Sequence, residues 1–286
     1  MGWLEAIILG IVQGLTEFLP ISSSAHQLIV GQVFMGGRDP GAAFTAVTQL
    51  GTETAVLIYF ARDIARIISR WARSLAGKVP HSDPDARMGW FVIFGSLPIG
   101  ILGLLFQDAI DSSLRNLWIT VATLGGVALL LGFADRVVAR RLQHKELANL
   151  NWADAIIYGL AQAAALIPGV SRSGATISAG LYLGYSRSAA ARYAFLLAIP
   201  AVFASGLYKL TDIGSDACVQ WGPTIVATLV AGVIGYAVIA WLLRFISHHS
   251  FTAFVIYRLI LAALLAGLLI GGVVAPDAAL NAGCGA

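Results

Sequence analysis

The sequence predicts an all-α integral membrane protein, an inverted-topology repeat with six spanning helices and two re-entrant helical hairpins. Composition, the length of the apolar stretches and an internal similarity lead to this fold class. Of the 286 residues, 58% are hydrophobic and 12% are charged, and the mean hydropathy is +0.81. Soluble domains carry about 25% charged residues, so a soluble enzyme and a disordered chain are excluded. We expect a single membrane domain over residues 1–286.

Six stretches are long and apolar enough to cross a bilayer, which takes about 20 apolar residues in a helix. They are residues 44–61, 88–107, 117–135, 188–208, 223–243 and 251–274. Two further apolar regions, 2–35 and 153–185, are each broken by a proline and a serine-containing loop. The arm after each break has roughly half the length needed to span. Each region is therefore predicted to enter the membrane and return, with protein or water around its loop.

The two broken regions resemble each other in sequence. Segment 3–13, WLEAIILGIVQ, aligns with 152–162, WADAIIYGLAQ, and both continue to the loop after a slip of one or two residues. A shorter similarity relates 119–124 to 224–229. Chance similarity between apolar helices would not favour shared Trp, Gly and Gln. We therefore interpret the pattern as an internal duplication, in which repeat one covers 1–140 and repeat two covers 150–275.

The basic residues predict how the two repeats are oriented. Thirteen of the eighteen Lys and Arg residues gather near 62–87, 136–145 and 187–192 and after the fifth span, which places these loops in the cytoplasm. Each repeat then crosses the membrane three times, so the second is inverted and the hairpin loops meet near the midplane. Topology thus explains the net charge of +3, and no nucleic-acid partner is expected.

Polar side chains concentrate around the first break. The cluster comprises Gln13, Glu17, Ser22, Ser23, Ser24 and His26. Polar groups are costly at membrane depth and usually mark a pathway or a site. A hydroxyl that caps a helix is the ordinary explanation for one serine, but it does not account for a carboxylate and an imidazole beside three hydroxyls. We therefore predict that Glu17 and its neighbours are functional.

The second break adds an arginine. Arg172 lies between Ser171 and Ser173, and Thr176 opens the following arm. An arginine flanked by hydroxyls at a helix N-terminus suits an oxyanion such as phosphate. An arginine that only anchors a helix at the cytoplasmic surface is not expected after Pro168, inside the broken region. We predict that a phosphate group binds where the two hairpins meet.

Other polar residues leave alternatives open. Glu53 lies one turn after Gln49 in the first full span, where it either faces the site or pairs with Arg258 in the last span. Cys218 and Cys284 lack metal-ligand spacing, so neither a zinc site nor a disulfide framework is expected. Metalloprotease and nucleotide-binding motifs are absent from the sequence.

The loop sequences resemble a known family. Residues 13–26, QGLTEFLPISSSAH, and 168–176, PGVSRSGAT, are similar to the two hallmark motifs of undecaprenyl-diphosphate phosphatases of the bacitracin-resistance type. The similarity covers essentially the whole chain, including QLG at 49–51. It implies an enzyme of the bacterial inner membrane that opens to the outer side and hydrolyses undecaprenyl diphosphate, a polyprenyl diphosphate lipid. It also implies a divalent cation, Mg²⁺ or Ca²⁺.

The resemblance assigns roles by position. Glu17 matches the essential acid and is the expected metal ligand, Ser23 the nucleophile, His26 the motif histidine and Arg172 the phosphate-binding arginine. Gln13 stands where many members have Glu, whereas Glu53 falls where many are apolar and receives no role. Further substrate contacts are expected from Gln13, Gln49, Ser22, Ser24, Ser171, Ser173 and Thr176.

Two questions remain open at this stage. The attacking group is Ser23, His26 or water, and the residues do not choose between them. Composition, topology and duplication also fit a transporter or flippase of a phosphorylated lipid, which would need no nucleophile. The metal preference, the prenyl chain length and the choice between a monomer and a homodimer are likewise open.

Overall fold

The computed structural model describes residues 2–34, 41–111, 114, 116–213 and 220–276, and its regular elements there are helices. The elements are α1 (Trp3–Thr16), α2 (Ser23–Phe34), α3 (Gly41–Tyr59), α4 (Ala61–Leu75), α5 (Pro84–Leu105), α6 (Gln107–Asp111), α7 (Leu117–Ala139), η2 (Leu147–Asn149), α8 (Trp152–Ala164), α9 (Arg172–Leu183), α10 (Arg187–Ile213), α11 (Trp221–Ile246) and α12 (Thr252–Ile270). The predicted all-α class is confirmed. Both cysteines lie outside the described residues.

Five of the described helices are long and apolar enough to cross a membrane, namely α5, α7, α10, α11 and α12. They coincide with five of the six predicted stretches, so a multi-pass membrane protein is supported. The remaining stretch forms α3, which is not among the five. Gln49, Glu53 and four threonines lower the hydropathy of this helix. The same polar residues bring α3 to the candidate site described below.

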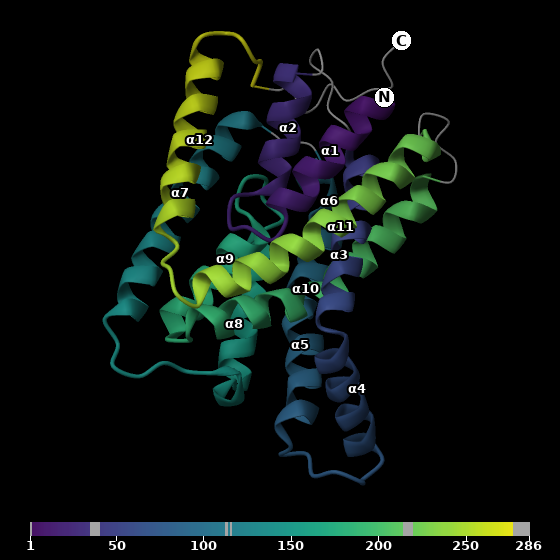
Figure 1. Ribbon diagram of the computed structural model, residues 1–286, viewed down its shortest axis with the longest axis vertical. Helices are drawn as coiled ribbons and strands as arrows, with labels where there is room; N and C mark the ends of the chain where they lie inside the picture. The colour runs from purple at the N-terminus through teal and green to yellow at the C-terminus, as the bar shows by residue number, and fades with distance from the viewer. Residues whose placement is uncertain (1, 35–40, 112–113, 115, 214–219, 277–286) are drawn as a thin grey trace.

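Two helix–loop–helix units lie at the centre of the molecule. The first is α1 and α2 with loop 17–22 between them, and the second is α8 and α9 with loop 165–171. Figure 1 shows the two loops, in purple and teal, together in the middle of the bundle. Ser173 Oγ, at the start of α9, donates a hydrogen bond of 3.0 Å to the Leu19 carbonyl oxygen of the first loop. The breaks predicted from the sequence thus meet in space.

Both loops end in the same unusual backbone conformation. Ser22 has φ 73° and Ser171 has φ 69°, and among the described residues these are the only positive φ values outside glycine. Each serine directly precedes the second helix of its unit, and the two are separated in sequence as Trp3 and Trp152 are. The shift of one residue between the two aligned segments therefore affects the prolines, Pro20 and Pro168. The serines are aligned again without a shift. Left-handed backbone at a non-glycine residue is costly and tends to occur at functional sites.

Close helix crossings fix α1 and α3 against α11. A Cβ atom on Gly51 of α3 would overlap the Thr228 carbonyl oxygen of α11, and Gly232 of α11 faces Gly51 across the same crossing. In the same way, a Cβ on Gly10 of α1 would overlap the backbone of Ala227. Small residues at such crossings let helix backbones approach closely in membrane proteins. Helix α1, which ends just before Glu17, and helix α3, which carries Glu53, therefore pack against the same helix, α11.

The predicted cytoplasmic loop 62–87 is largely helical. It contains α4, which packs along the start of α5, and the two helices extend from the bundle at the bottom of Figure 1. Arg66 contacts Asp85 at 3.0 Å, and Arg192 of α10 contacts Asp63 at 2.7 Å. These ion pairs attach the basic helix to α5 and α10, away from the two central loops.

Gly51→Ala tests the close crossing of α3 and α11. We expect it to lower the free energy of unfolding by about 1–3 kcal/mol, because the added methyl group overlaps a backbone carbonyl that cannot easily move. Thermal unfolding of the purified protein in detergent measures this change. Gly125→Ala is the matched control, since a Cβ atom there meets nothing within 4 Å. Equal stability of the two variants would contradict the crossing.

Candidate active site

Glu17 is the centre of a hydrogen-bonded group that joins the two loops. Its Oε2 atom accepts hydrogen bonds from Gln13 Nε2 at 2.7 Å and from Ser23 Oγ at 2.6 Å. Its Oε1 atom accepts one from Arg172 Nη2 at 2.8 Å. Glu17 is therefore in direct contact with a hydroxyl of the same hairpin and with a guanidinium that lies 155 residues away in sequence.

Local structure explains how these side chains converge. Gln13 and Glu17 lie one turn apart at the end of α1, whereas Ser23 and Arg172 occupy the first positions of α2 and α9. Gln27 Nε2 donates to Gln13 Oε1 at 3.2 Å. This contact orients the Gln13 amide so that its nitrogen points to Glu17. The predicted shared face of Gln13 and Glu17 is present in the structure.

Arg172 also lies beside a second carboxylate. Its Nη2 atom is 3.5 Å from Oε2 of Glu53, whose side chain is fully buried in α3. Among the described residues, neither carboxylate oxygen of Glu53 accepts a hydrogen bond. Of the two placements left open by the sequence, Glu53 therefore faces the site residue Arg172.

Arg258 has a different set of partners. Its guanidinium is buried, and all its hydrogen bonds, between 2.9 and 3.2 Å, go to backbone carbonyl oxygens. The acceptors belong to Pro20, Gly169, Val170, Thr123 and Leu124. Because they come from both central loops and from α7, one side chain holds the two loops together. The sequence left Arg258 open as one of two possible partners of Glu53, and the carbonyl acceptors that Arg258 contacts cannot be identified from a sequence.

His26 is held at the side of the first loop. Its Nδ1 atom lies 2.7 Å from the Ser22 carbonyl oxygen, and its Nε2 atom lies 2.7 Å from the Tyr257 hydroxyl. The His26 and Tyr257 rings are stacked with centroids 5.6 Å apart. Both ring nitrogens are used in these contacts, and His26 is not among the residues that line the cavity. A catalytic role for His26 stays a prediction, and the sequence analysis did not identify Tyr257 as its partner.

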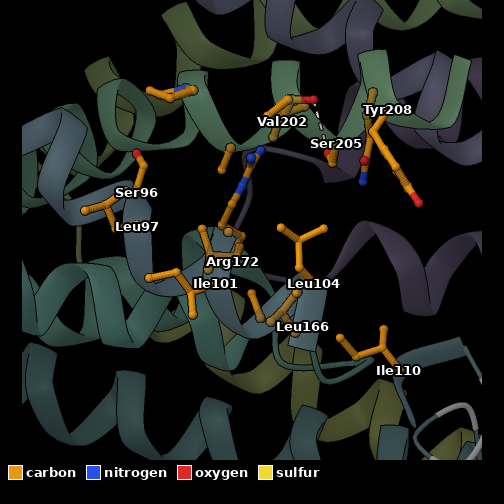
Figure 2. A pocket seen from close by; sticks show the side chains of 18 of the residues that line it. Ser96, Leu97, Ile101, Leu104, Ile110, Leu166, Arg172, Val202, Ser205 and Tyr208 are labelled. Carbon is orange, nitrogen blue, oxygen red and sulfur yellow. Dashed lines mark hydrogen bonds between the residues drawn. The ribbon is translucent and has the colours of Figure 1, made fainter. Parts of the chain in front are cut away.

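A cavity of about 940 Å³ opens beside the Glu17–Arg172 pair. Figure 2 shows Arg172 within it, between Leu97 and Leu104 of α5 and Val202 of α10. Its polar end is lined by Glu17, Ser22, Ser23, Ser24, Gln49, Ser171 and Arg172. The remaining wall is mostly apolar and comes from α5, α6, α10 and the second loop. Sequence reasoning identified the polar end but gave no signal for this wall beyond general apolarity.

Two of the predicted substrate contacts support the loops. Ser173 Oγ donates to the Leu19 carbonyl oxygen and lies 3.2 Å from Ser171 Oγ, while Thr176 Oγ1 donates to the Arg172 carbonyl oxygen. Neither Ser173 nor Thr176 lines the cavity. The structure therefore places these two hydroxyls behind the Arg172 turn, where they stabilise its conformation.

The carboxylates of the site restrict how a divalent cation could bind. In the part of the chain that the structure describes, no group of three or more His, Cys, Asp or Glu side chains is placed to hold a metal ion. Beside Arg172 there are two carboxylates, of which Glu17 lines the cavity and Glu53 does not. Magnesium is commonly bound by one or two carboxylates together with substrate phosphates. This donor set fits a cation that binds with a phosphorylated substrate, rather than one held by protein ligands alone.

Comparison with known proteins covers almost the whole chain. The family profile described as bacitracin resistance protein BacA matches residues 6–264. This chain belongs to that family. A Micrococcus luteus protein named undecaprenyl-diphosphatase is 62% identical over 278 residues, covering 96% of this chain and 99% of the relative. A Streptomyces coelicolor protein named undecaprenyl-diphosphatase 2 is 56% identical over 292 residues, covering 99% of this chain and 100% of the relative. The family resemblance of the two loop motifs is thereby confirmed.

Arg258→Lys tests the link between the loops. Lysine offers three donors on one atom in place of a five-donor fork, so several carbonyl oxygens lose their partner. Because hydrogen bonds to charged groups contribute about 1.5–3 kcal/mol each, we expect a loss of about 3 kcal/mol in the free energy of unfolding, measured by thermal or denaturant unfolding in detergent.

The control for this variant is Arg244→Lys, at an exposed arginine near the end of α11. It should change the free energy of unfolding by less than about 0.5 kcal/mol. A wild-type stability for Arg258→Lys would show that the loops do not depend on this side chain.

Proposed function

We propose that this protein is an undecaprenyl-diphosphatase that acts at the cavity between the two central loops. It is a membrane hydrolase that converts undecaprenyl diphosphate into undecaprenyl phosphate and inorganic phosphate, and so recycles the lipid carrier of cell-wall synthesis. Membership of the BacA family and relatives of that name support the activity, and bacitracin resistance follows from the family. The observation that carries the proposed site is the contact of Glu17 with both Ser23 and Arg172 at the polar end of an apolar cavity.

The shape of the cavity suits a lipid diphosphate. Its polar end would take the diphosphate, and the apolar wall of α5 and α10 would contact the first isoprene units of the tail. Arginine has five N–H donors, and Arg172 uses its Nη2 group for Glu17. The remaining donors can bind the oxygens of the terminal phosphate and stabilise the charge that develops on them.

The geometry favours Ser23 as the attacking group. Its hydroxyl already donates to Glu17 Oε2 at 2.6 Å, which is the arrangement expected for a nucleophile and its proton acceptor. Attack of Ser23 Oγ on the terminal phosphorus would break the bond to the bridging oxygen and release undecaprenyl phosphate. Glu17 would first pass the serine proton to the departing undecaprenyl phosphate. Water would then attack the phosphoserine while Glu17 accepts its proton, and Glu17 would return that proton to Ser23 Oγ as the bond from Oγ to phosphorus breaks and inorganic phosphate leaves. His26 is turned to Tyr257 and is the weaker candidate.

A divalent cation, Mg²⁺ or Ca²⁺, is part of the proposal. Glu17 would hold it together with the diphosphate oxygens, and the ion would supply charge neutralisation at the leaving phosphate. The protein residues have separate tasks: Arg172 binds the terminal phosphate, and the hydroxyls of Ser22, Ser24 and Ser171 line the same end of the cavity.

The membrane arrangement is proposed on the same basis. In this arrangement the α1–α2 and α8–α9 units are hairpins of two inverted repeats that enter the membrane from opposite sides, and α3 is the sixth spanning helix. The left-handed serines at equivalent loop ends support the repeat, and the basic residues of α4 support a cytoplasmic location for that helix. We place the protein in the bacterial inner membrane with the cavity open to the outer side.

Phosphate release from undecaprenyl diphosphate by the purified protein in detergent tests the site. We expect turnover with Mg²⁺ or Ca²⁺ that is lost with excess EDTA. Arg172→Ala and Glu17→Gln should each lower kcat by about 100-fold or more, since each removes a group that contacts the reacting phosphate or its nucleophile. Arg244→Ala is the surface control.

The outcome of this assay separates the two classes of function. Detergent removes any membrane gradient, so turnover identifies hydrolysis, whereas folded wild-type protein without turnover under any metal would favour a transporter of phosphorylated lipids. Full activity of Arg172→Ala would remove Arg172 from phosphate binding.

Gly100→Phe tests the apolar wall as the tail site. Gly100 lines the cavity, and a Cβ atom there meets nothing within 4 Å, so the ring can occupy the cavity without disturbing α5. We expect KM to rise several-fold for the C55 diphosphate and to change little for a C15 diphosphate. Gly126→Phe, at an equally open position away from the cavity, should change neither value. An equal effect on both substrates would exclude a tail site.

A further inference from the structure

Glu53 is a buried ionisable group beside the site that the mechanism above does not use. Its side chain has no exposed surface, and neither carboxylate oxygen accepts a hydrogen bond within the described residues. Burying a carboxylate without partners is strongly unfavourable, and such a group requires a compensating charge. The cation in contact with it is Arg172, whose Nη2 atom lies 3.5 Å from Glu53 Oε2.

The position of Glu53 is set by the tightest crossing in α3. Gly51, two residues earlier, packs against the Thr228 carbonyl oxygen of α11, which leaves the helix no room to shift. Gln49, one turn before Glu53, lines the cavity. Glu53 itself is not a lining residue, so it approaches Arg172 from the protein interior rather than from the cavity.

Arg172 is thus placed between two carboxylates of different character. Glu17, on the cavity side, accepts a hydrogen bond of 2.8 Å from Arg172 and also accepts hydrogen bonds from Ser23 and Gln13. Glu53, on the interior side, accepts no hydrogen bond among the described residues and interacts with Arg172 through its charge. When a phosphate binds and Glu17 accepts a proton or a cation, Glu53 is the carboxylate that still faces the guanidinium.

We propose that Glu53 is a positioning residue for Arg172. Its charge holds the guanidinium at the back of the cavity, keeps Nη2 at Glu17, and leaves the other N–H donors directed to the bound phosphate. Glu53 acts on the reaction only through Arg172. The inference rests on the proposed function, because it assigns to Glu53 the support of the phosphate-binding arginine.

A double-mutant cycle tests this role with Glu53→Gln and Arg172→Lys. Gln keeps the shape of Glu and removes the charge. We expect Glu53→Gln to lower kcat/KM for undecaprenyl diphosphate about tenfold, the effect of losing one interaction with a charged group. Its melting temperature in detergent should change little, because the attraction lost at Arg172 is offset by the lower cost of burying a neutral amide in place of a carboxylate. In the Arg172→Lys background the same change should cost less than about threefold, since residues that act as a unit are not additive.

The controls separate a local effect from a general one. Glu53→Asp keeps the charge and should restore part of the activity, and Glu53→Met, which also lacks the charge, replaces Glu53→Gln in the cycle if that variant does not fold. Thr54→Val alters the next residue of α3 at an exposed position and should match the wild type.

The proposal would be overturned if Glu53→Gln kept the wild-type kcat/KM. It would also be overturned if the melting temperature of Glu53→Gln fell enough to explain its loss of activity. The third such result is a double variant in which the losses of the two single variants multiply. Failure of the proposed function itself would appear elsewhere, as absent turnover in the wild type or full turnover in Arg172→Ala.

Discussion

The fold depends on the hydrogen bonds between the buried Arg258 guanidinium and the carbonyl oxygens of two broken helices. A broken helix leaves carbonyl groups without partners, and inside a membrane domain water does not readily replace them. A buried arginine, in contrast, carries N–H donors that require acceptors. Pro20, Gly169 and Val170 supply acceptors from both loops. The loop carbonyl oxygens thereby gain donors, and the buried guanidinium gains acceptors. Non-helical backbone at the centre of the bundle is stable for this reason.

The site is a direct consequence of that arrangement. Once the loops are held together, Ser22 and Ser171 turn the chain into α2 and α9, and the first residues of these helices, Ser23 and Arg172, reach the same carboxylate. None of these side chains needs a long reach or an unusual partner. The chemistry is concentrated because two helix starts and one helix end point to one place, with an apolar cavity beside them.

Much of this could be predicted from the sequence, because helix breaks and charged residues in apolar segments are visible in it. Glu17, Ser23 and Arg172 were expected at the site from residue types and loop similarity, and the structure brings them together. Three features could not be predicted. The partners of Arg258 are carbonyl groups, which every residue has. The apolar wall of the cavity looks like any spanning helix. The side of α3 that carries Glu53 depends on a glycine crossing that is fixed only by tertiary packing.

The matched loop ends have a consequence for how such a site arises. Under the proposed repeat, Ser23 and Arg172 are equivalent positions, each following a left-handed serine. A symmetric pair of identical chains would place the same side chain at both, giving either two hydroxyls or two cations. The substrate is itself unsymmetrical, with one phosphate that leaves and one that keeps the tail. Fusing two copies into a single chain frees the halves to diverge, so that one presents the nucleophile and the other the positive charge.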